Sequence, residues 1–192
     1  MPNIGDSERK TQNRVVKFFR DKLHYTYMGN LHDSENHNIV QERLYAWLLK
    51  QGYSEKLAAN ALDALVKTST NLQQNLYHAN KEVYSLLKYG AKVKESVEQS
   101  PKTVYFIDFE DVSKNDFYIA EEVTIVSKNT KRPDIVLYVN GIALAVIELK
   151  KSSVSVSDGI RQNLTNQKSN FIEEFFTTIQ LCMAGNDSEG FR

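Results

Sequence analysis

Apolar residues in the first half of the chain recur every three to four positions, which is the spacing of one face of an α-helix. This pattern predicts helices over residues 7–24 and 39–51, a third from Ser54 onward, and a fourth over about 72–91. Ser7 and Ser54 are suitable N-caps. The predicted inward positions are Val15, Val16, Phe18, Phe19 and Leu23, then Val40, Leu44, Trp47 and Leu48, then Leu57, Ala58, Ala61, Leu62 and Leu65, and finally Leu76, Val83, Tyr84 and Leu87.

After residue 100 the pattern changes to short runs rich in β-branched and aromatic residues, which favour strands. Strands are predicted over 104–109 and 117–126, followed by a hairpin over 134–150. The second hairpin strand is apolar on both faces, as expected of a strand in the centre of a sheet. A helix over 157–176 and a strand over 175–184 complete the prediction.

This order of elements indicates an α/β chain with a mixed sheet. The chain of 192 residues and 22.0 kDa suits one domain. We divide it into a first core helix (7–30), a helical insertion (31–100) and a sheet core (101–192) that holds the hairpin. The insertion carries no chemical motif, so it is interpreted as packing or as a docking surface.

Composition excludes several classes of protein. The apolar runs are too short to span a bilayer, and residues 1–10 lack the apolar segment of a signal peptide. The single cysteine, Cys182, rules out an internal disulfide and fits a reducing cytoplasm. We therefore expect a cytoplasmic protein without membrane contact.

The net charge is zero, which argues against a protein that grips nucleic acid by bulk electrostatics. Residues 128–168 nevertheless carry seven basic groups against three acids, a local net charge of +4. Such a field would help a phosphate backbone to approach, although a solvated charged face explains the charge equally well. Any binding by this chain alone should be weak and sensitive to salt.

Three charged residues at the open end of the hairpin are the strongest chemical signal. Asp134 begins the first strand, and Glu148 and Lys150 end the second. A buried charge needs a partner, and the natural partner of two carboxylates is a divalent cation. Lys150 shares a face with Glu148 because side chains alternate along a strand. Two metal-binding acids beside a lysine predict a site for phosphodiester chemistry.

The register of the hairpin decides whether this prediction can hold. A strict two-residue turn at Asn140–Gly141 puts Asp134 and Glu148 on opposite faces. A three-residue loop, with Gly141 as a left-handed bulge residue, shifts the pairing and brings Asp134, Glu148 and Lys150 to one face. The metal hypothesis therefore requires a bulge at Gly141, or an equivalent distortion nearer Asp134.

The same residues carry a resemblance to a known family. Pro133-Asp134, thirteen residues, and then Glu148-Leu149-Lys150 resembles the PD-(D/E)xK nuclease motif. With the flanking segments 159–164, 175–181 and 8–15, the chain is similar to the N-terminal nuclease domain of the restriction and motor (R) subunit of type I restriction enzymes. The resemblance implies a restriction-endonuclease-like core, with a central mixed sheet flanked by helices.

For individual residues the resemblance implies a Mg²⁺ site. Asp134, Glu148 and the carbonyl of Leu149 would bind the ion, and Lys150 would orient the attacking water or stabilise charge on the phosphate. Glu8 occupies the place of a first-helix acid that completes or supports the metal shell in related nucleases. An ordinary first-turn acid, favoured by the helix dipole, explains Glu8 equally well.

The family also carries Gln-x-x-x-Tyr on the helix after the active strand. Gln162 matches the glutamine and is expected to support Lys150 or to contact the DNA. Asn166 stands where the tyrosine would be, which leaves that aromatic contribution in question.

The resemblance further implies partners. In the family the nuclease domain is fused to an ATP-driven motor, here expected beyond residue 192, and assembles with methylation and specificity subunits on double-stranded DNA. The sequence contains no Walker A phosphate loop, so this piece should neither hydrolyse ATP nor select sequence. We expect the isolated piece to be monomeric and weakly active. The alternative is a non-catalytic DNA-contact or docking module that keeps the fold.

Overall fold

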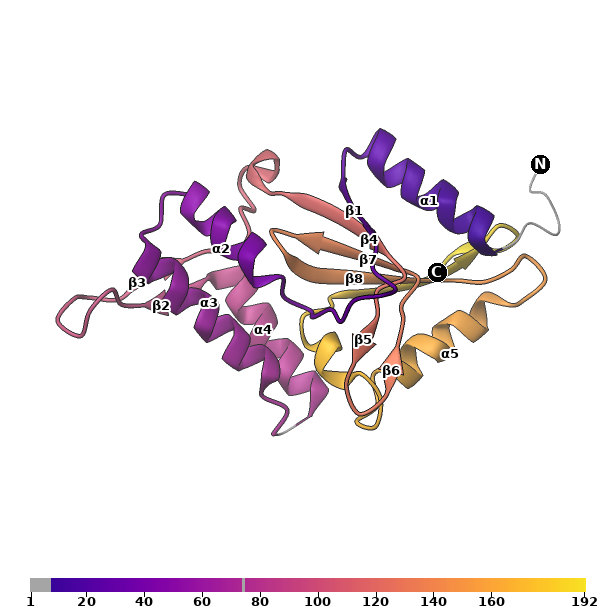
Figure 1. Ribbon diagram of the computed structural model, residues 1–192. Coiled ribbons are helices and arrows are strands. Elements are labelled where there is room, and N and C mark those ends of the chain that lie inside the picture. Colours follow the sequence, from indigo (N-terminus) through magenta and orange to yellow (C-terminus); the bar gives the residue numbers. More distant parts are fainter. Residues whose placement is uncertain (1–7, 74) are drawn as a thin grey trace.

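The structure, a computed structural model, describes residues 8–73 and 75–192 and contains one mixed six-stranded sheet flanked by helices (Figure 1). This confirms the predicted fold class. The helices are α1 (Glu8–Lys22), α2 (Gln41–Lys50), α3 (Glu55–Thr70), α4 (Leu76–Tyr89) and α5 (Val156–Asn166), with 3₁₀ turns η1 (Val112–Lys114) and η2 (Glu173–Thr177). The strands are β1 (Thr26–Asn30), β2 (Ala91–Val93), β3 (Lys102–Val104), β4 (Phe117–Glu121), β5 (Ile125–Val126), β6 (Thr130–Lys131), β7 (Ile135–Val139), β8 (Ile142–Leu149), β9 (Leu181–Asn186) and β10 (Gly190–Phe191).

The main sheet has the strand order β1-β4-β7-β8-β9-β10. The central strands β4, β7 and β8 are antiparallel neighbours, and β9 runs parallel to β8. Strand β8 is buried along almost its whole length, as its two apolar faces predicted. Helices α1 and α5 lie on opposite sides of the sheet (Figure 1).

Side chains that alternate along β7 and β8 belong to two different apolar clusters. Ile135 and Ile147 pack on the side of α1, where Val16 is buried with them. Val136 and Val146 pack on the opposite side, the side of α5. The side of the sheet on which each other side chain of β7 and β8 lies follows from this alternation.

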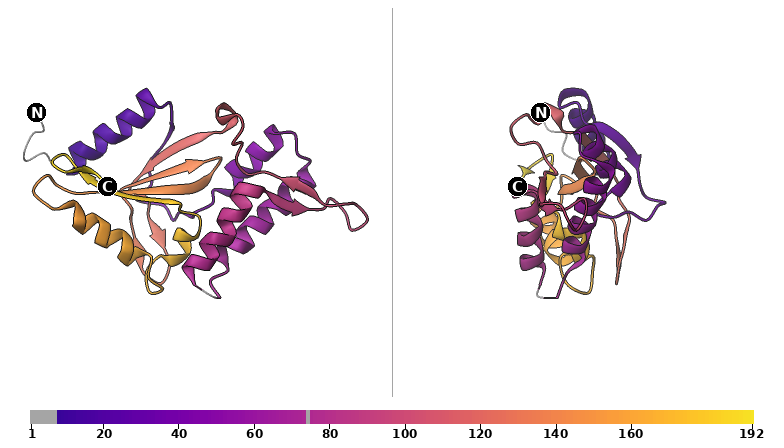
Figure 2. Two further views of the ribbon diagram at one scale, coloured as in Figure 1. Left: turned by 180° about the vertical axis from the view of Figure 1, so that it is seen from behind. Right: turned by 90° about the vertical axis from the view of Figure 1, so that its left-hand side faces the viewer.

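Helices α2, α3 and α4 and the β2–β3 hairpin form a layer at one end of the sheet (Figure 2). Their core consists of aliphatic side chains, among them Leu44, Leu48 and Leu65, which are fully buried. This core continues through Val104 and Phe106 and reaches Ile142 of β8. The helical layer is thus joined to the same strand that carries Glu148.

Three of the four N-terminal helices lie close to their predicted bounds, and Ser54 caps α3 by accepting the N–H of Leu57. The predicted inward positions Phe18 and Leu23 are wrong, because both side chains are exposed and Leu23 lies beyond the end of α1. The predicted cap Ser7 lies outside the described residues. Helix α4 begins later than predicted, because Asn75 caps it through the N–H of His78, and its Tyr84 is exposed rather than inward. Residues 26–30 form β1, parallel to β4, and are not part of a helix.

Several predicted boundaries in the second half are wrong. The first predicted strand, 104–109, overlaps β3 only at Val104, and the second breaks after Glu121 because Glu122 adopts a left-handed backbone with φ 53°. Helix α5 ends at Asn166, where the polar run 167–170 favours turns, and β9 begins only at Leu181. Within the described residues no helix is both long and apolar enough to cross a bilayer.

Candidate active site

The turn of the β7–β8 hairpin is a two-residue turn, so the predicted bulge at Gly141 is wrong. Asn140 and Gly141 both have positive φ (54° and 90°), the conformation of a type I′ turn. The turn is held tightly, because a Cβ on Gly141 would lie 2.8 Å from the carbonyl oxygen of Val40. The register instead shifts further along, where Leu144 is the extra residue on β8. The carbonyl of Leu144 accepts the N–H of Gln180, 2.8 Å away.

This bulge at Leu144 is the equivalent distortion that the metal hypothesis required. Beyond it, Ile135 pairs with Ile147, so the next pair along the hairpin is Asp134 and Glu148. Both acids project toward the α5 side of the sheet, because their neighbours two residues away, Val136 and Val146, do so. The structure therefore brings the two acids together through the bulge at Leu144.

The hydrogen bonds of Asp134 and Glu148 offset only part of the cost of burying their carboxylates. Glu148 is fully buried, and its Oε2 accepts the Nε2 hydrogen of Gln162 at 2.8 Å. Its Oε1 is buried, and no N–H or O–H group of the described residues donates to it. Glu148 and Asp134 can bond to each other only when one of them carries a proton, which contributes to the raised pKa of Glu148. Asp134 accepts the backbone N–H of Leu149 at 2.6 Å. Burial of a carboxylate oxygen with no partner is unfavourable, and a cation at this point would remove that cost.

Both acids bind protons more tightly than free carboxylates do. Burial, reinforced by the neighbouring Asp134, raises the pKa of Glu148 to about 8. Burial also raises the pKa of Asp134 to about 6, although the N–H of Leu149 and the charge of Lys150 oppose the rise. Two adjacent acids with pKa values raised in this way would ionise more readily beside a divalent cation.

Lys150 and Gln162 complete the cluster. The Nζ of Lys150 donates to Oε1 of Gln162 at 2.8 Å, while the same amide donates to Glu148. The amide can serve both groups in only one orientation, with its oxygen toward the ammonium and its nitrogen toward the carboxylate. Gln162 therefore fixes the position of Lys150 relative to Glu148. Asn166, one turn further along α5, is buried.

A glycine lets α5 approach closely enough for this bridge to form. A Cβ on Gly159 would lie 2.9 Å from the Cβ of Ala184 and 3.6 Å from the Cβ of Glu148. Gln162 follows three residues later and so lies on the same face of the helix. The sequence prediction missed the role of Gly159, although a glycine inside a predicted helix was the available signal.

Helix α1 contributes a second contact that the sequence did not reveal. The buried Gln12 donates from Nε2 to the carbonyl oxygen of Asp134 at 3.2 Å and to Glu122 at 3.1 Å. Arg132 forms an ion pair with the other oxygen of Glu122 at 2.7 Å. These bonds hold the backbone on both sides of Pro133, immediately before the first acid.

Glu8 and Leu149 were also predicted to contribute to the metal site. Glu8 is the first residue of α1, and its negative charge raises the pKa of both Asp134 and Glu148. Even so, the described residues contain no set of three His, Cys, Asp or Glu side chains arranged to hold a metal ion. The side chain of Leu149 is buried on the α1 side.

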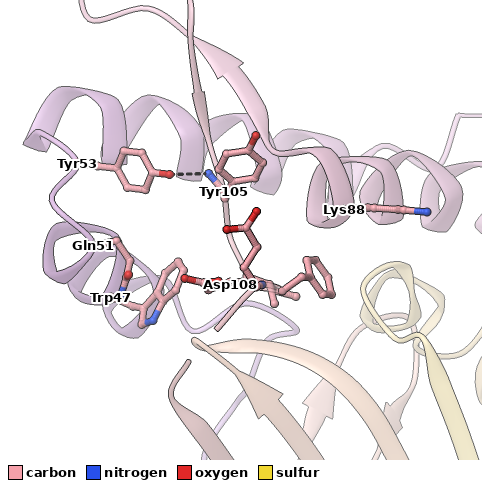
Figure 3. A pocket seen from close by; sticks show the side chains of 9 residues that line it. Trp47, Gln51, Tyr53, Lys88, Tyr105 and Asp108 are labelled. Atoms are coloured by element: carbon pink, nitrogen blue, oxygen red, sulfur yellow. Dashed lines mark hydrogen bonds between the residues drawn. The ribbon is translucent and has the colours of Figure 1, made fainter. Parts of the chain in front are cut away.

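A cavity of about 440 Å³ lies away from these acids, between the helical layer and the segment after β3 (Figure 3). Tyr53 accepts the backbone N–H of Tyr105 through its hydroxyl at 3.1 Å. Asp108 accepts two backbone N–H groups of the turn that follows it, and the indole of Trp47 donates to the carbonyl of Lys114. The polar groups around this cavity thus hold the local structure, and Trp47 is a core residue as predicted.

Comparison with known proteins identifies a family that matches nearly the whole chain. The family described as "Type I restriction enzyme R protein N terminus" matches residues 6–191. The chain is 31% identical over 132 residues to the "Putative type I restriction enzyme MjaIXP endonuclease subunit" of Methanocaldococcus jannaschii, which covers 64% of this chain and 12% of that protein. It is 37% identical over 100 residues to the "Type I restriction enzyme HindI endonuclease subunit" of Haemophilus influenzae, covering 50% of this chain and 10% of the relative. The aligned region is thus about a tenth of the length of these relatives.

Proposed function

Because the chain belongs to the family of type I restriction enzyme R protein N termini, we propose that it is the nuclease part of an endonuclease subunit and cleaves double-stranded DNA with Mg²⁺. The observation that carries the proposal is the pair formed by Asp134 and Glu148 beside Lys150, with one buried carboxylate oxygen lacking a partner. Family membership alone does not assign these roles, and the geometry supplies the physical reason for them.

The residues present fit a magnesium ion. Asp134 and Glu148 would hold it through carboxylate oxygens, which are the ligands that Mg²⁺ prefers, and the carbonyl of Leu149 is a candidate third ligand. When bound, the ion supplies positive charge to the scissile phosphate and makes a water molecule more acidic. Glu8 is proposed to support the site through its charge.

The other side chains act by position and charge. Lys150 holds an ammonium group beside the two acids, where it can orient the attacking water and stabilise the negative charge that develops on the phosphate. Gln162 keeps that ammonium in place and at the same time holds Glu148 by its Oε2. The Oε1 of Glu148, which accepts no hydrogen bond, would then be available to bind the ion.

The relatives are named as subunits of type I restriction enzymes, and they are far longer than this chain. We propose that an ATP-driven motor and the methylation and specificity subunits bring DNA to this site. A chain with zero net charge is suited to that arrangement, because it need not capture DNA by its own charge. On this account the isolated chain cuts DNA slowly.

The test uses the complete restriction enzyme with ATP, Mg²⁺ and supercoiled plasmid. We expect Asp134→Ala and Lys150→Ala in the R subunit to reduce cutting by about 10²–10⁴-fold while ATP hydrolysis continues. Lys92→Ala removes the same charge from an exposed position of β2, and the variant enzyme should cut normally. Normal cutting by Lys150→Ala and Asp134→Ala would show that this chain is a docking or DNA-contact module rather than the nuclease.

A further inference from the structure

The β5–β6 hairpin is unusually basic for this chain, and the turn after α5 carries one lysine and no acid before Glu173. Residues 123–133 contain three basic residues (Lys128, Lys131, Arg132) and no acid, and residues 163–172 contain one (Lys168) and no acid. The whole chain has equal numbers of acidic and basic residues. We call residues 125–132 and 167–172 together the basic arm.

The two parts of the basic arm are packed together. The ammonium of Lys131 lies over the ring of Phe171, 4.7 Å from its centroid. At the root of the arm, Ile125 and Ile172 belong to one apolar cluster. The hairpin lies beside the C-terminal end of α5 in both Figure 1 and Figure 2. The basic arm is therefore one surface built from two segments.

This surface is rooted on the catalytic side of the sheet. The cluster that holds Ile125 and Ile172 also contains Val136 and Val146, whose side of the sheet is that of Asp134 and Glu148. Lys131 is only three residues before Asp134 in the chain. A long ligand that is bound at Asp134 and Glu148 can therefore also contact the basic arm.

The positive charges of the arm are largely uncompensated. Within residues 8–73 and 75–192, Lys128, Lys131 and Lys168 form no ion pair, and Lys128 and Lys168 are exposed. Arg132 is the exception, because it is paired with Glu122. On α5, by contrast, Arg161 is paired with Asp158 at 2.6 Å.

The tip of the arm is polar as well as basic. Residues 127–130 are Ser, Lys, Asn and Thr, and all four are exposed. Protein interfaces have apolar centres, whereas contacts to a nucleic-acid backbone come from Lys, Ser, Thr and Asn side chains. The composition of the tip therefore fits phosphate groups better than it fits a protein surface.

We propose that the basic arm binds the phosphate backbone of the same duplex that is cut at Asp134 and Glu148, an inference that rests on the proposed function. Lys128 is six residues before Asp134. At about 3.3 Å per residue, an extended segment reaches at most roughly 20 Å, or about six base pairs at 3.4 Å each. The arm would thus hold the duplex up to about half a helical turn from the cut, and would fix its direction across the site.

The test measures duplex binding separately from cleavage. A fluorescent duplex of about 30 base pairs is titrated with the chain at several salt concentrations, with Ca²⁺ in place of Mg²⁺. The variant Lys128→Gln/Lys131→Gln should bind about tenfold more weakly at low salt, and the slope of log K against log salt should become shallower by about two. Lys81→Gln/Lys92→Gln removes the same charge from the helical layer and should leave both quantities unchanged.

Three results would overturn the proposal. The first is unchanged duplex binding by Lys128→Gln/Lys131→Gln. The second is an equal loss of affinity in the control variant, which would mean that the chain attracts DNA only by its total charge. The third is that the unmodified chain shows no measurable duplex binding at low salt. Failure of the proposed function is a separate outcome, because it shows as normal plasmid cutting by Asp134→Ala in the complete enzyme. That variant should retain the full salt slope in the binding assay if the basic arm holds DNA.

Discussion

The core of the helical layer and the end of the β7–β8 hairpin are equally buried, yet their chemistry is opposite. Leu65 and Glu148 are both completely enclosed. In the described residues, buried polar side-chain atoms without a partner are confined to positions 121–178, and none lies in the helices α2, α3 and α4. The core of the helical layer therefore stabilises the fold, whereas the end of the β7–β8 hairpin buries charged groups at a cost in stability. Among the buried atoms without a partner, Oε1 of Glu148 lies on the carboxylate that is next to Asp134 and shares Gln162 with Lys150, where a cation could bind.

The largest effect should follow a change in the helical layer. Leu65→Ala leaves a cavity in a closely packed core and should lower the free energy of unfolding by about 2–5 kcal/mol, measured by urea denaturation. Leu164→Ala changes an exposed leucine and should alter stability by less than about 0.5 kcal/mol. Equal losses in the two variants would remove the distinction between a packed core and the rest of the molecule.

The contribution of Asp134 and Glu148 to the free energy of unfolding should change with pH in the direction opposite to that of a carboxylate in an ordinary ion pair. Between about pH 4 and about pH 8 the folded protein holds protons on Asp134 and Glu148 that the unfolded chain has released. Without metal, the free energy of unfolding should therefore fall by several kcal/mol as pH rises through this window.

Glu148→Gln should remove most of this fall and should be more stable than the original chain at pH 8. Its amide can still accept from Gln162, and it loses the charge that burial opposes. Thermal melts in chelator at pH 5 and pH 8 measure both effects. A stability that rises with pH over this range would show that the two acids are already well compensated.

A smaller effect is expected at Gly159, where α5 approaches β8 and β9. Gly159→Ala brings a Cβ within 2.9 Å of Ala184, so α5 must move outward, at a cost of about 1–3 kcal/mol. The same movement withdraws Gln162 from Lys150 and should weaken Mg²⁺ binding by about 10–100-fold. The double variant Gly159→Ala/Ala184→Gly frees the space and should recover most of both losses. A double variant no better than Gly159→Ala would show that this contact does not set the position of α5.

Features that depend on residues close together in the chain could be predicted from the sequence. Helical periodicity located α1, α2 and α3, and the alternation of side chains along one strand placed Glu148 and Lys150 on the same face. For Asp134 the sequence set a condition, a bulge in the hairpin, which the structure meets at Leu144. The resemblance to a family added Gln162, which the structure places between Lys150 and Glu148.

The features that were missed depend on contacts between distant residues. The bulge lies at Leu144 rather than Gly141, since the turn is held against Val40 and the carbonyl of Leu144 bonds to Gln180. The contact of Gln12 with the carbonyl of Asp134 joins residues 122 positions apart. No local pattern encodes a contact of that kind.

The most direct test of the central claim is the effect of Mg²⁺ on stability at pH 8, compared between the original chain and Glu148→Gln. If the buried acids await a cation, Mg²⁺ at about 100 times its dissociation constant should stabilise the original chain by about 2.7 kcal/mol. The same addition should leave Glu148→Gln almost unchanged. No stabilisation of the original chain, or equal stabilisation of the two proteins, would contradict the assignment of a metal site to Asp134 and Glu148.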